Sequence, residues 1–152
     1  EIIQRQLAEV GIAAKIRVLE WSAFVTHFIN KRRFDAVILG WTIPPDPDAY
    51  DVWHSSKTAP EELNFVSYSN PEADEMLEKG RSTFHQDERK KYYDRFQEIL
   101  AEDQPYTFLY VPDDLIIISN RVRGIEPAPA GIGHNFIRWY VPKEEQKYTM
   151  TR

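Results

Sequence analysis

The sequence predicts an α/β fold in which helices flank a mixed sheet. A strand–helix–strand pattern occupies residues 13–40, two amphipathic helical patterns fall within residues 71–102, and two more strand patterns cover residues 105–119. The chain has 152 residues, of which 42% are hydrophobic, and this is enough for one packed core.

The first ten residues predict an amphipathic helix. Ile3, Leu7 and Val10 recur at helical spacing, and Gly11 follows as a natural stop. Since the helix has no start signal of its own and no signal sequence precedes it, we expect further residues before Glu1.

A right-handed strand–helix–strand unit is predicted next. Residues 13–20 alternate between apolar and polar, as a half-buried strand does. Ser22 can cap the helix that follows, and its apolar stripe includes Phe24 and Phe28. Residues 34–40 form a short, continuous apolar run, which is typical of a strand covered on both faces.

The loop after this second strand is the predicted binding site, because ligands of open α/β sheets collect outside the carboxyl ends of parallel strands. Three prolines stiffen residues 41–54, and the aromatic side chains there provide flat contact area. The candidate ligand-binding residues are Trp41, Asp46, Asp48, Tyr50, Trp53 and His54.

Two helices are predicted beyond the loop. Asn70 as N-cap and Pro71 at the first helical position start a helix over residues 71–81. A second helix is expected over residues 86–102, and its apolar stripe comprises Tyr92, Phe96, Ile99 and Leu100.

Strand patterns return before an irregular tail. Residues 105–111 and 114–119 are predicted as strands joined by a turn at residues 112–114. From residue 120 onward, glycine and proline are frequent, and this segment is too irregular for a second core.

Composition and spacing argue against several classes of function. The net charge is −5 with no basic stripe, so nucleic acid is not an expected partner, and charged runs such as residues 88–91 predict solvated helix faces. Cysteine is absent and the four histidines are isolated. The acids of the loop do not match an EF-hand. We therefore expect no catalytic residue, no metal site and no cofactor.

The loop and its surroundings resemble the family 5 extracellular solute-binding proteins, which serve peptide, dipeptide and nickel ABC importers. The resemblance begins with residues 34–41, 45–50 and 53–55. Further matches follow in the family's order at residues 64–65, 68–72, Asp74, 89–100, 101–106 and 124–125. Several spaced matches in one order make the resemblance specific.

The resemblance implies a type II clamshell, the fold of periplasmic binding proteins, in which a ligand is buried between two lobes. Residues 1–120 would be the distal lobe without its first strand. Residues 121–152 would be a tail that returns toward a proximal lobe, which this chain does not include.

The function implied is that of the substrate-binding component of an ABC importer, not an enzyme. It would bind an oligopeptide or dipeptide at the periplasmic or extracellular face of the cytoplasmic membrane, and the full-length protein could carry a lipid anchor. Lobe closure would then deliver the cargo to the permease subunits.

One departure from the family leaves the cargo open. In oligopeptide binders an aspartate shortly after the Gly-Trp pair neutralises the ligand's amino group, and Pro44 stands there in this chain. Asp46 or Asp48 could reach the same charge from another backbone path. The alternatives are a sugar, nickel or a metallophore held by His54 or His134, and a sensor or scaffold module.

Overall fold

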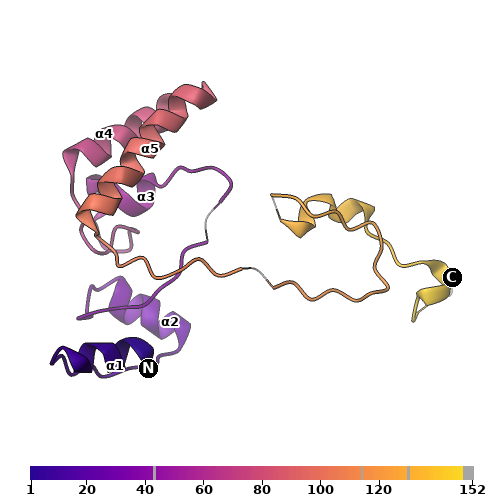
Figure 1. Cartoon of the computed structure of the whole chain (residues 1–152), viewed down its shortest axis with the longest axis horizontal. Coiled ribbons are helices and arrows are strands. Elements are labelled where there is room, and N and C mark those ends of the chain that lie inside the picture. Colours follow the sequence, from indigo (N-terminus) through magenta and orange to yellow (C-terminus); the bar gives the residue numbers. More distant parts are fainter. Residues whose placement is uncertain (43, 114, 130, 149–152) are drawn as a thin grey trace. The chain divides into compact units, whose positions relative to one another are not determined.

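A computed structural model describes four stretches of the chain: residues 1–42, 44–113, 115–129 and 131–148. The chain divides into two compact units, Glu1–Thr107 and Phe108–Arg152. The N-terminal unit contains helices α1 to α5, which Figure 1 labels. The predicted boundary between lobe and tail at residue 120 stays a prediction.

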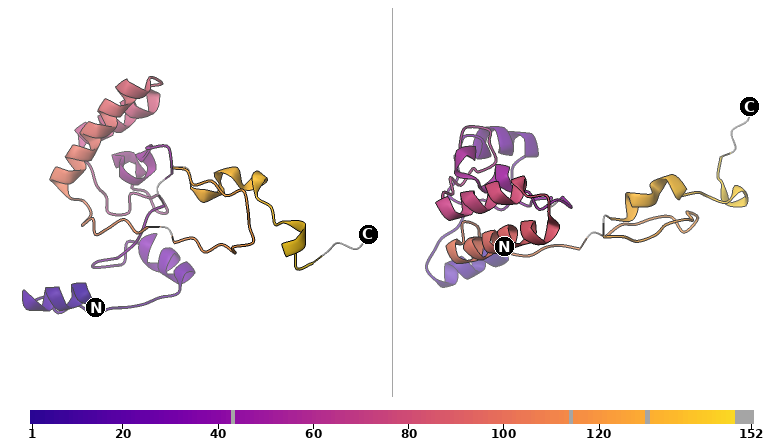
Figure 2. Two further views of the ribbon diagram at one scale, coloured as in Figure 1. Left: turned by 45° about the vertical axis from the view of Figure 1, so that its right-hand side comes forward. Right: turned by 90° about the horizontal axis from the view of Figure 1, so that it is seen from above.

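A helical hairpin forms the centre of the N-terminal unit. Helix α4 (Pro71–Ser82) and helix α5 (Gln86–Asp103) pack along each other, as Figures 1 and 2 show from several directions. Both predicted helices are therefore confirmed. The side chain of Asn70 accepts hydrogen bonds from the backbone N–H groups of Glu72 and Ala73, as the capping signal predicts.

The hydrophobic core lies on the inner face of this hairpin. Helix α3 (Tyr50–Trp53) packs against α4 and adds one tryptophan to the core. On α5, Tyr93 is buried in place of the predicted Tyr92, which is only half-buried. The buried core residues are Trp53, Ala73, Leu77, Tyr93, Phe96, Ile99 and Leu100.

The first two predicted helices are also present. Helix α1 (Ile2–Glu9) ends before Gly11, whose φ of 83° suits glycine. Helix α2 (Trp21–Phe24) continues into the π-helical turn η1 (Val25–Ile29). The cap of α2 differs from the prediction, because the carboxylate of Glu20 accepts the N–H groups of Ser22 and Ala23. These bonds hold the pKa of Glu20 below its ordinary value.

The predicted mixed sheet is not confirmed. Among the described residues of 13–20, 34–40, 105–111 and 114–119, no strand forms. The predicted turn at 112–114 includes Asp114, which lies outside the described residues. A strand is stable only when a neighbour pairs with its backbone N–H and C=O groups, and the β-bridge found among the described residues joins Arg123 to Tyr140, outside these segments. An apolar pattern predicts a strand's faces but does not provide its partner.

The C-terminal unit is held by polar contacts. An antiparallel bridge joins Arg123 to Tyr140. The buried side chain of Asn135 donates to the carbonyl of Gly124 and accepts from the indole of Trp139. Two 3₁₀ helices, η3 (Ile132–Arg138) and η4 (Lys143–Glu145), complete this unit. Across the described parts of both units, no helix combines the length and the apolar character needed to cross a bilayer.

Candidate functional site

Two aspartates shape the loop of residues 41–54. The Oδ1 atom of Asp46 accepts the N–H of Asp48 at 2.9 Å, and Oδ1 of Asp48 accepts the N–H of Tyr50 at 3.1 Å. Aspartate commonly forms turns in this way. The two consecutive turns lead the chain directly into α3.

The same aspartates form ion pairs with the α4–α5 hairpin. Arg89 binds Asp46 through two nitrogens, with Nη2 2.7 Å from Oδ1 and Nη1 3.1 Å from Oδ2. Arg81 Nε lies 2.9 Å from Oδ2 of Asp48. Hydrogen bonds from Arg89 hold the pKa of Asp46 below its ordinary value, and Asp46 in turn raises the pKa of Arg89. Each carboxylate therefore already has a cationic partner.

Both arginines are held by further contacts. The guanidinium of Arg81 lies 4.3 Å from the ring centre of Tyr50. That of Arg89 lies 5.2 Å from the ring centre of Tyr93, and its Nε donates to the carbonyl of Gly80 at 3.0 Å. Arg89 is thus an exception to the predicted solvated face at residues 88–91.

His54 lies in the packing between α3 and α4, with only 7% of its surface exposed. Its ring stacks on Tyr50 at a centroid distance of 4.1 Å. Nδ1 accepts the N–H of Ser56 at 3.1 Å, and Nε2 faces Oε1 of Glu78 at 3.3 Å. Both ring nitrogens therefore face protein groups.

Trp53 is buried in the core, with 6% of its surface exposed. Its ring packs against Tyr106 at 4.4 Å and against Tyr68 at 5.9 Å between centroids. Beneath it, Asn64 is fully buried and its Nδ2 donates to the carbonyls of His54 and Tyr68. These contacts fasten the end of the loop to the unit's interior.

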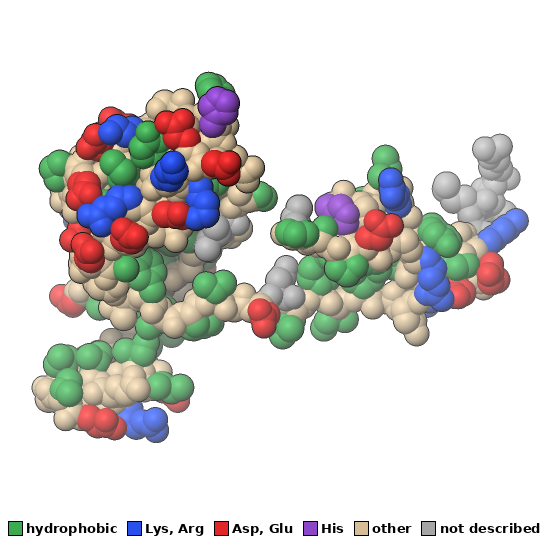
Figure 3. Space-filling view, turned by 45° about the horizontal axis from the view of Figure 1, so that its top comes forward, with side chains coloured by type: hydrophobic (Ala, Val, Ile, Leu, Met, Phe, Trp, Pro, Cys, Tyr) green, Lys and Arg blue, Asp and Glu red, His purple; other side chains and the backbone are tan. Residues whose placement is uncertain are grey.

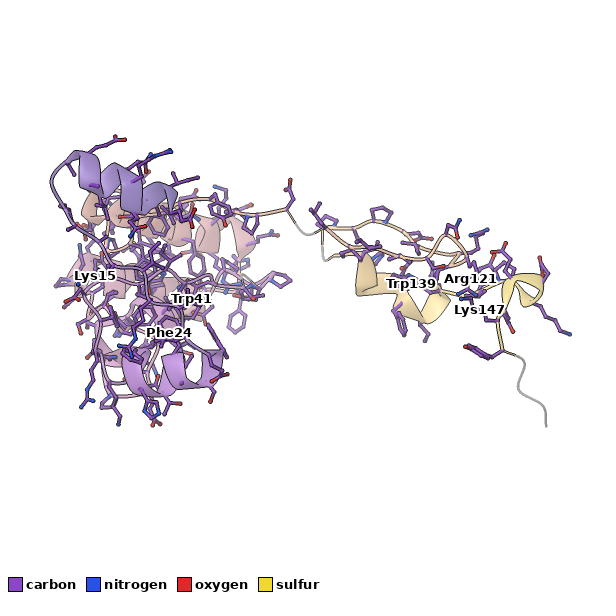
Figure 4. All side chains as sticks on the ribbon, turned by 90° about the horizontal axis from the view of Figure 1, so that it is seen from below. Lys15, Phe24, Trp41, Arg121, Trp139 and Lys147 are labelled. Atoms are coloured by element: carbon purple, nitrogen blue, oxygen red, sulfur yellow. The ribbon has the colours of Figure 1, made fainter. Side chains whose placement is uncertain are left out.

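Trp41 is the exposed end of a stack of aromatic rings. Its indole lies on Phe65, with 6.1 Å between centroids and 22° between planes, and 41% of its surface is exposed. Phe65 stacks in turn on Tyr106 at 5.9 Å. Burial raises the pKa of Tyr106, and a hydrogen bond with Trp41 acts in the opposite direction. Figure 4 shows Trp41 among the side chains of the N-terminal unit.

The six predicted residues thus separate into three kinds. Trp41 presents aromatic surface to solvent, while Tyr50, half-buried between His54 and Arg81, is packed within the protein like the buried Trp53 and His54. Asp46 and Asp48 are tied to arginines. The loop therefore offers aromatic surface supported by buried residues and fixed by ion pairs.

Five contributing residues were not among those predicted for the site. Asn64 and Phe65 belong to the matches that carry the family resemblance, so their order in the sequence was a usable signal. Arg89 and Tyr106 also fall in matched stretches, whereas Arg81 does not, and nothing in the sequence pairs Arg89 with Asp46, which lies 43 residues away. The full set is Asn64, Phe65, Arg81, Arg89 and Tyr106.

Charge on the N-terminal unit is mixed in sign. Figure 3 shows Lys and Arg interspersed with Asp and Glu on the visible face of the helical body. Ion pairs such as Arg95–Glu72 account for part of this pattern. Among the described residues, no three His, Asp or Glu side chains gather closely enough to hold a metal ion.

Known proteins resemble the chain over nearly its whole length, although no family profile matches it. The oligopeptide-binding protein AppA of Bacillus subtilis is 35% identical over 143 residues, which are 93% of this chain and 26% of AppA. The structure of AppA in complex with a nonapeptide matches 93% of the chain with a TM-score of 0.78. The chain thus spans about a quarter of the length of this relative.

Two further structures are similar. DppA of Helicobacter pylori, in complex with the peptide STSA, is 26% identical with a TM-score of 0.73, and the match covers 95% of this chain and 28% of DppA. NikZ of Campylobacter jejuni, in complex with Ni(L-His), is 25% identical with a TM-score of 0.66, and the match covers 91% of this chain and 29% of NikZ.

Proposed function

We propose that the chain binds a peptide for import. Over nearly its whole length it is homologous to the oligopeptide- and dipeptide-binding proteins of ABC transporters, which are the family 5 solute-binding proteins. The resemblance in the sequence is thereby confirmed. In this proposal the chain supplies one wall of a peptide site, and lobe closure delivers the peptide to the permease subunits.

The observation that carries the proposal is the match to AppA. It extends over 93% of the chain in both sequence and structure, and AppA was solved with a nonapeptide. The structural neighbours have the type II binding-protein fold, as predicted, and the relatives are binding proteins and not enzymes. The finer arrangement of lobes and tail remains part of the proposal.

We infer that Trp41 is the main point of contact with the cargo. A half-exposed indole on a buried phenylalanine offers a rigid apolar face that loses little entropy on binding. The ring of Tyr50 lies between His54 and Arg81, so Tyr50 contributes together with the buried Trp53 and His54 by supporting the loop from below.

A peptide is favoured over a metal as cargo. His54 was the donor expected for nickel within the loop, and its two ring nitrogens face Ser56 and Glu78. The peptide complexes of AppA and DppA also belong to structures with higher TM-scores than the nickel complex of NikZ. By the same homology, we propose a location outside the cytoplasmic membrane.

Calorimetric titration of the natural full-length protein with peptides tests the function. Dipeptides through to nonapeptides, a sugar panel and Ni²⁺ with histidine would be titrated separately. We expect binding of peptides, and Trp41→Ala should weaken it about tenfold or more, as loss of an aromatic anchor does. Trp21→Ala is the matched control, since Trp21 is 65% exposed and lies outside the loop. Binding of sugars or nickel without any peptide would refute the proposal.

A further inference from the structure

The acids of the loop are fully engaged by the protein itself. Asp46 accepts two hydrogen bonds from Arg89 and one from the backbone of Asp48. Asp48 accepts from the backbone of Tyr50 and pairs with Arg81. A carboxylate that already balances a guanidinium offers little net charge to the ammonium group of a ligand.

These contacts hold the loop at both ends of its proline-rich part. At one end, Trp41 stacks on Phe65. At the other end, Asp46 is bound by the guanidinium fork of Arg89, and that guanidinium is anchored by the carbonyl of Gly80. Pro44 and Pro45 restrict the chain between the two ends.

We propose that Arg89 and Arg81 are positioning residues that hold the ligand-contacting loop on the α4–α5 hairpin, with Asp46 and Asp48 as their anchors and not as ligands for the peptide's amino group. This inference rests on the proposed function. Its physical basis is pre-organisation: a loop already held in its binding conformation pays less entropy when the peptide arrives.

Arg95 provides a matched control on the same helix. It pairs with Glu72 at 2.7 Å and with Glu98 at 3.2 Å, so it is also an arginine with two acidic partners. Its side chain is 38% exposed, compared with 25% for Arg89. Both of these partners lie on the α4–α5 hairpin itself and outside the loop of residues 41–54.

The test compares Arg89→Gln, Arg89→Lys and Arg95→Gln in the natural full-length protein. Peptide association and dissociation rates would be measured by surface plasmon resonance, and melting temperatures in parallel. If Arg89→Gln leaves the loop in place for about a tenth of the time, the apparent Kd rises about tenfold. We expect this rise mainly as a slower association rate. Arg95→Gln should bind as the wild type does.

Arg89→Lys provides the rescue that a merely structural role would not show. Lysine keeps the charge but loses the two-pronged geometry, so its affinity should lie between those of the wild type and Arg89→Gln. Adding Arg81→Gln to Arg89→Gln should weaken binding further, because it releases the second anchor.

The outcomes separate this inference from the proposed function. A wild-type protein that binds no peptide refutes the function. If the wild type binds peptide, the positioning role alone is refuted when Arg89→Gln and Arg95→Gln both keep the wild-type affinity. It is likewise refuted when both variants lose affinity equally. The role is supported only if Arg89→Gln binds more slowly while its melting temperature matches that of Arg95→Gln.

Discussion

Gly80 lies where α4 meets the ring of Tyr93 on α5. A Cβ atom at this position would be 2.8 Å from Cζ of Tyr93, whose side chain is buried and in contact with Arg89. Glycine is normally a weak point in a helix, but here it permits close packing of the hairpin. The residue type at this one position therefore sets the distance between two helices.

We predict that Gly80→Ala destabilises the protein. Alanine gains up to about 1 kcal/mol of helix propensity, but overpacking against a buried ring costs about 1 to 3 kcal/mol. Urea unfolding would measure the difference. Gly40→Ala is the control, because nothing lies within 4 Å of its Cβ and its φ is not in the left-handed region. Equal effects of the two substitutions would contradict the steric argument.

The ion pair of Asp46 makes a pH-dependent contribution to stability. Its folded pKa is lowered below the ordinary value of 3.8, chiefly by Arg89, so the contribution is present above 3.8 and is lost as pH falls through the folded pKa. Wild type should therefore be more stable than Asp46→Asn at neutral pH, and the gap should close in strong acid. Urea unfolding from pH 7 downward measures this, and a gap that stays constant would contradict it.

At the scale of elements, the helices were predictable because their signals are local. The capping oxygen of Asn70, the proline after it and the acids of the first turn all lie within a few residues of the α4 start. The spacing of apolar residues likewise placed α5, although Tyr93 and not Tyr92 enters the core. Neighbouring positions differ by about 100° around a helix, so Tyr92 and Tyr93 lie at opposite edges of the apolar stripe and tertiary packing decides which of them is buried.

Loss of the Asn70 cap should weaken the hairpin. Asn70→Ala removes the acceptor for two backbone N–H groups and a hydrogen bond to Asp103 at 2.7 Å. We expect a loss of about 0.5 to 2 kcal/mol in the free energy of unfolding, measured with urea. Asn70→Ser keeps a capping oxygen and should retain more stability. Equal losses in the two variants would argue that the bond to Asp103 dominates.

The strands could not be predicted in the same way. An alternating or continuous apolar run describes what a segment would bury, whereas a strand also requires a neighbour for its backbone. In this structure Val18 is 89% exposed and Ile117 is 97% exposed, so these segments bury little of their apolar surface. The apolar pattern is a local property of the sequence, whereas the pairing that a strand needs depends on segments far away in the chain.

At the scale of the whole molecule, this exposed apolar surface has a measurable consequence. Contiguous exposed apolar residues promote association, and several lie between residues 108 and 117. We predict that the 152-residue chain, prepared alone, binds an apolar dye and self-associates as its concentration rises, which sedimentation velocity would detect. Val111→Lys with Ile117→Lys should reduce both effects. A dilution-independent monomer without dye binding would contradict this prediction.

The sequence by itself determined the helices, the family resemblance and the location of the candidate loop, because capping residues, helical spacing and motif order are all local or sequential properties. Tertiary structure alone decided which loop residues are buried, exposed or paired. It buried Trp53 and His54, left Trp41 half-exposed on Phe65, and paired Asp46 with Arg89 across 43 residues. Such contacts depend on how α4 and α5 pack, so no spacing within the loop could have revealed them.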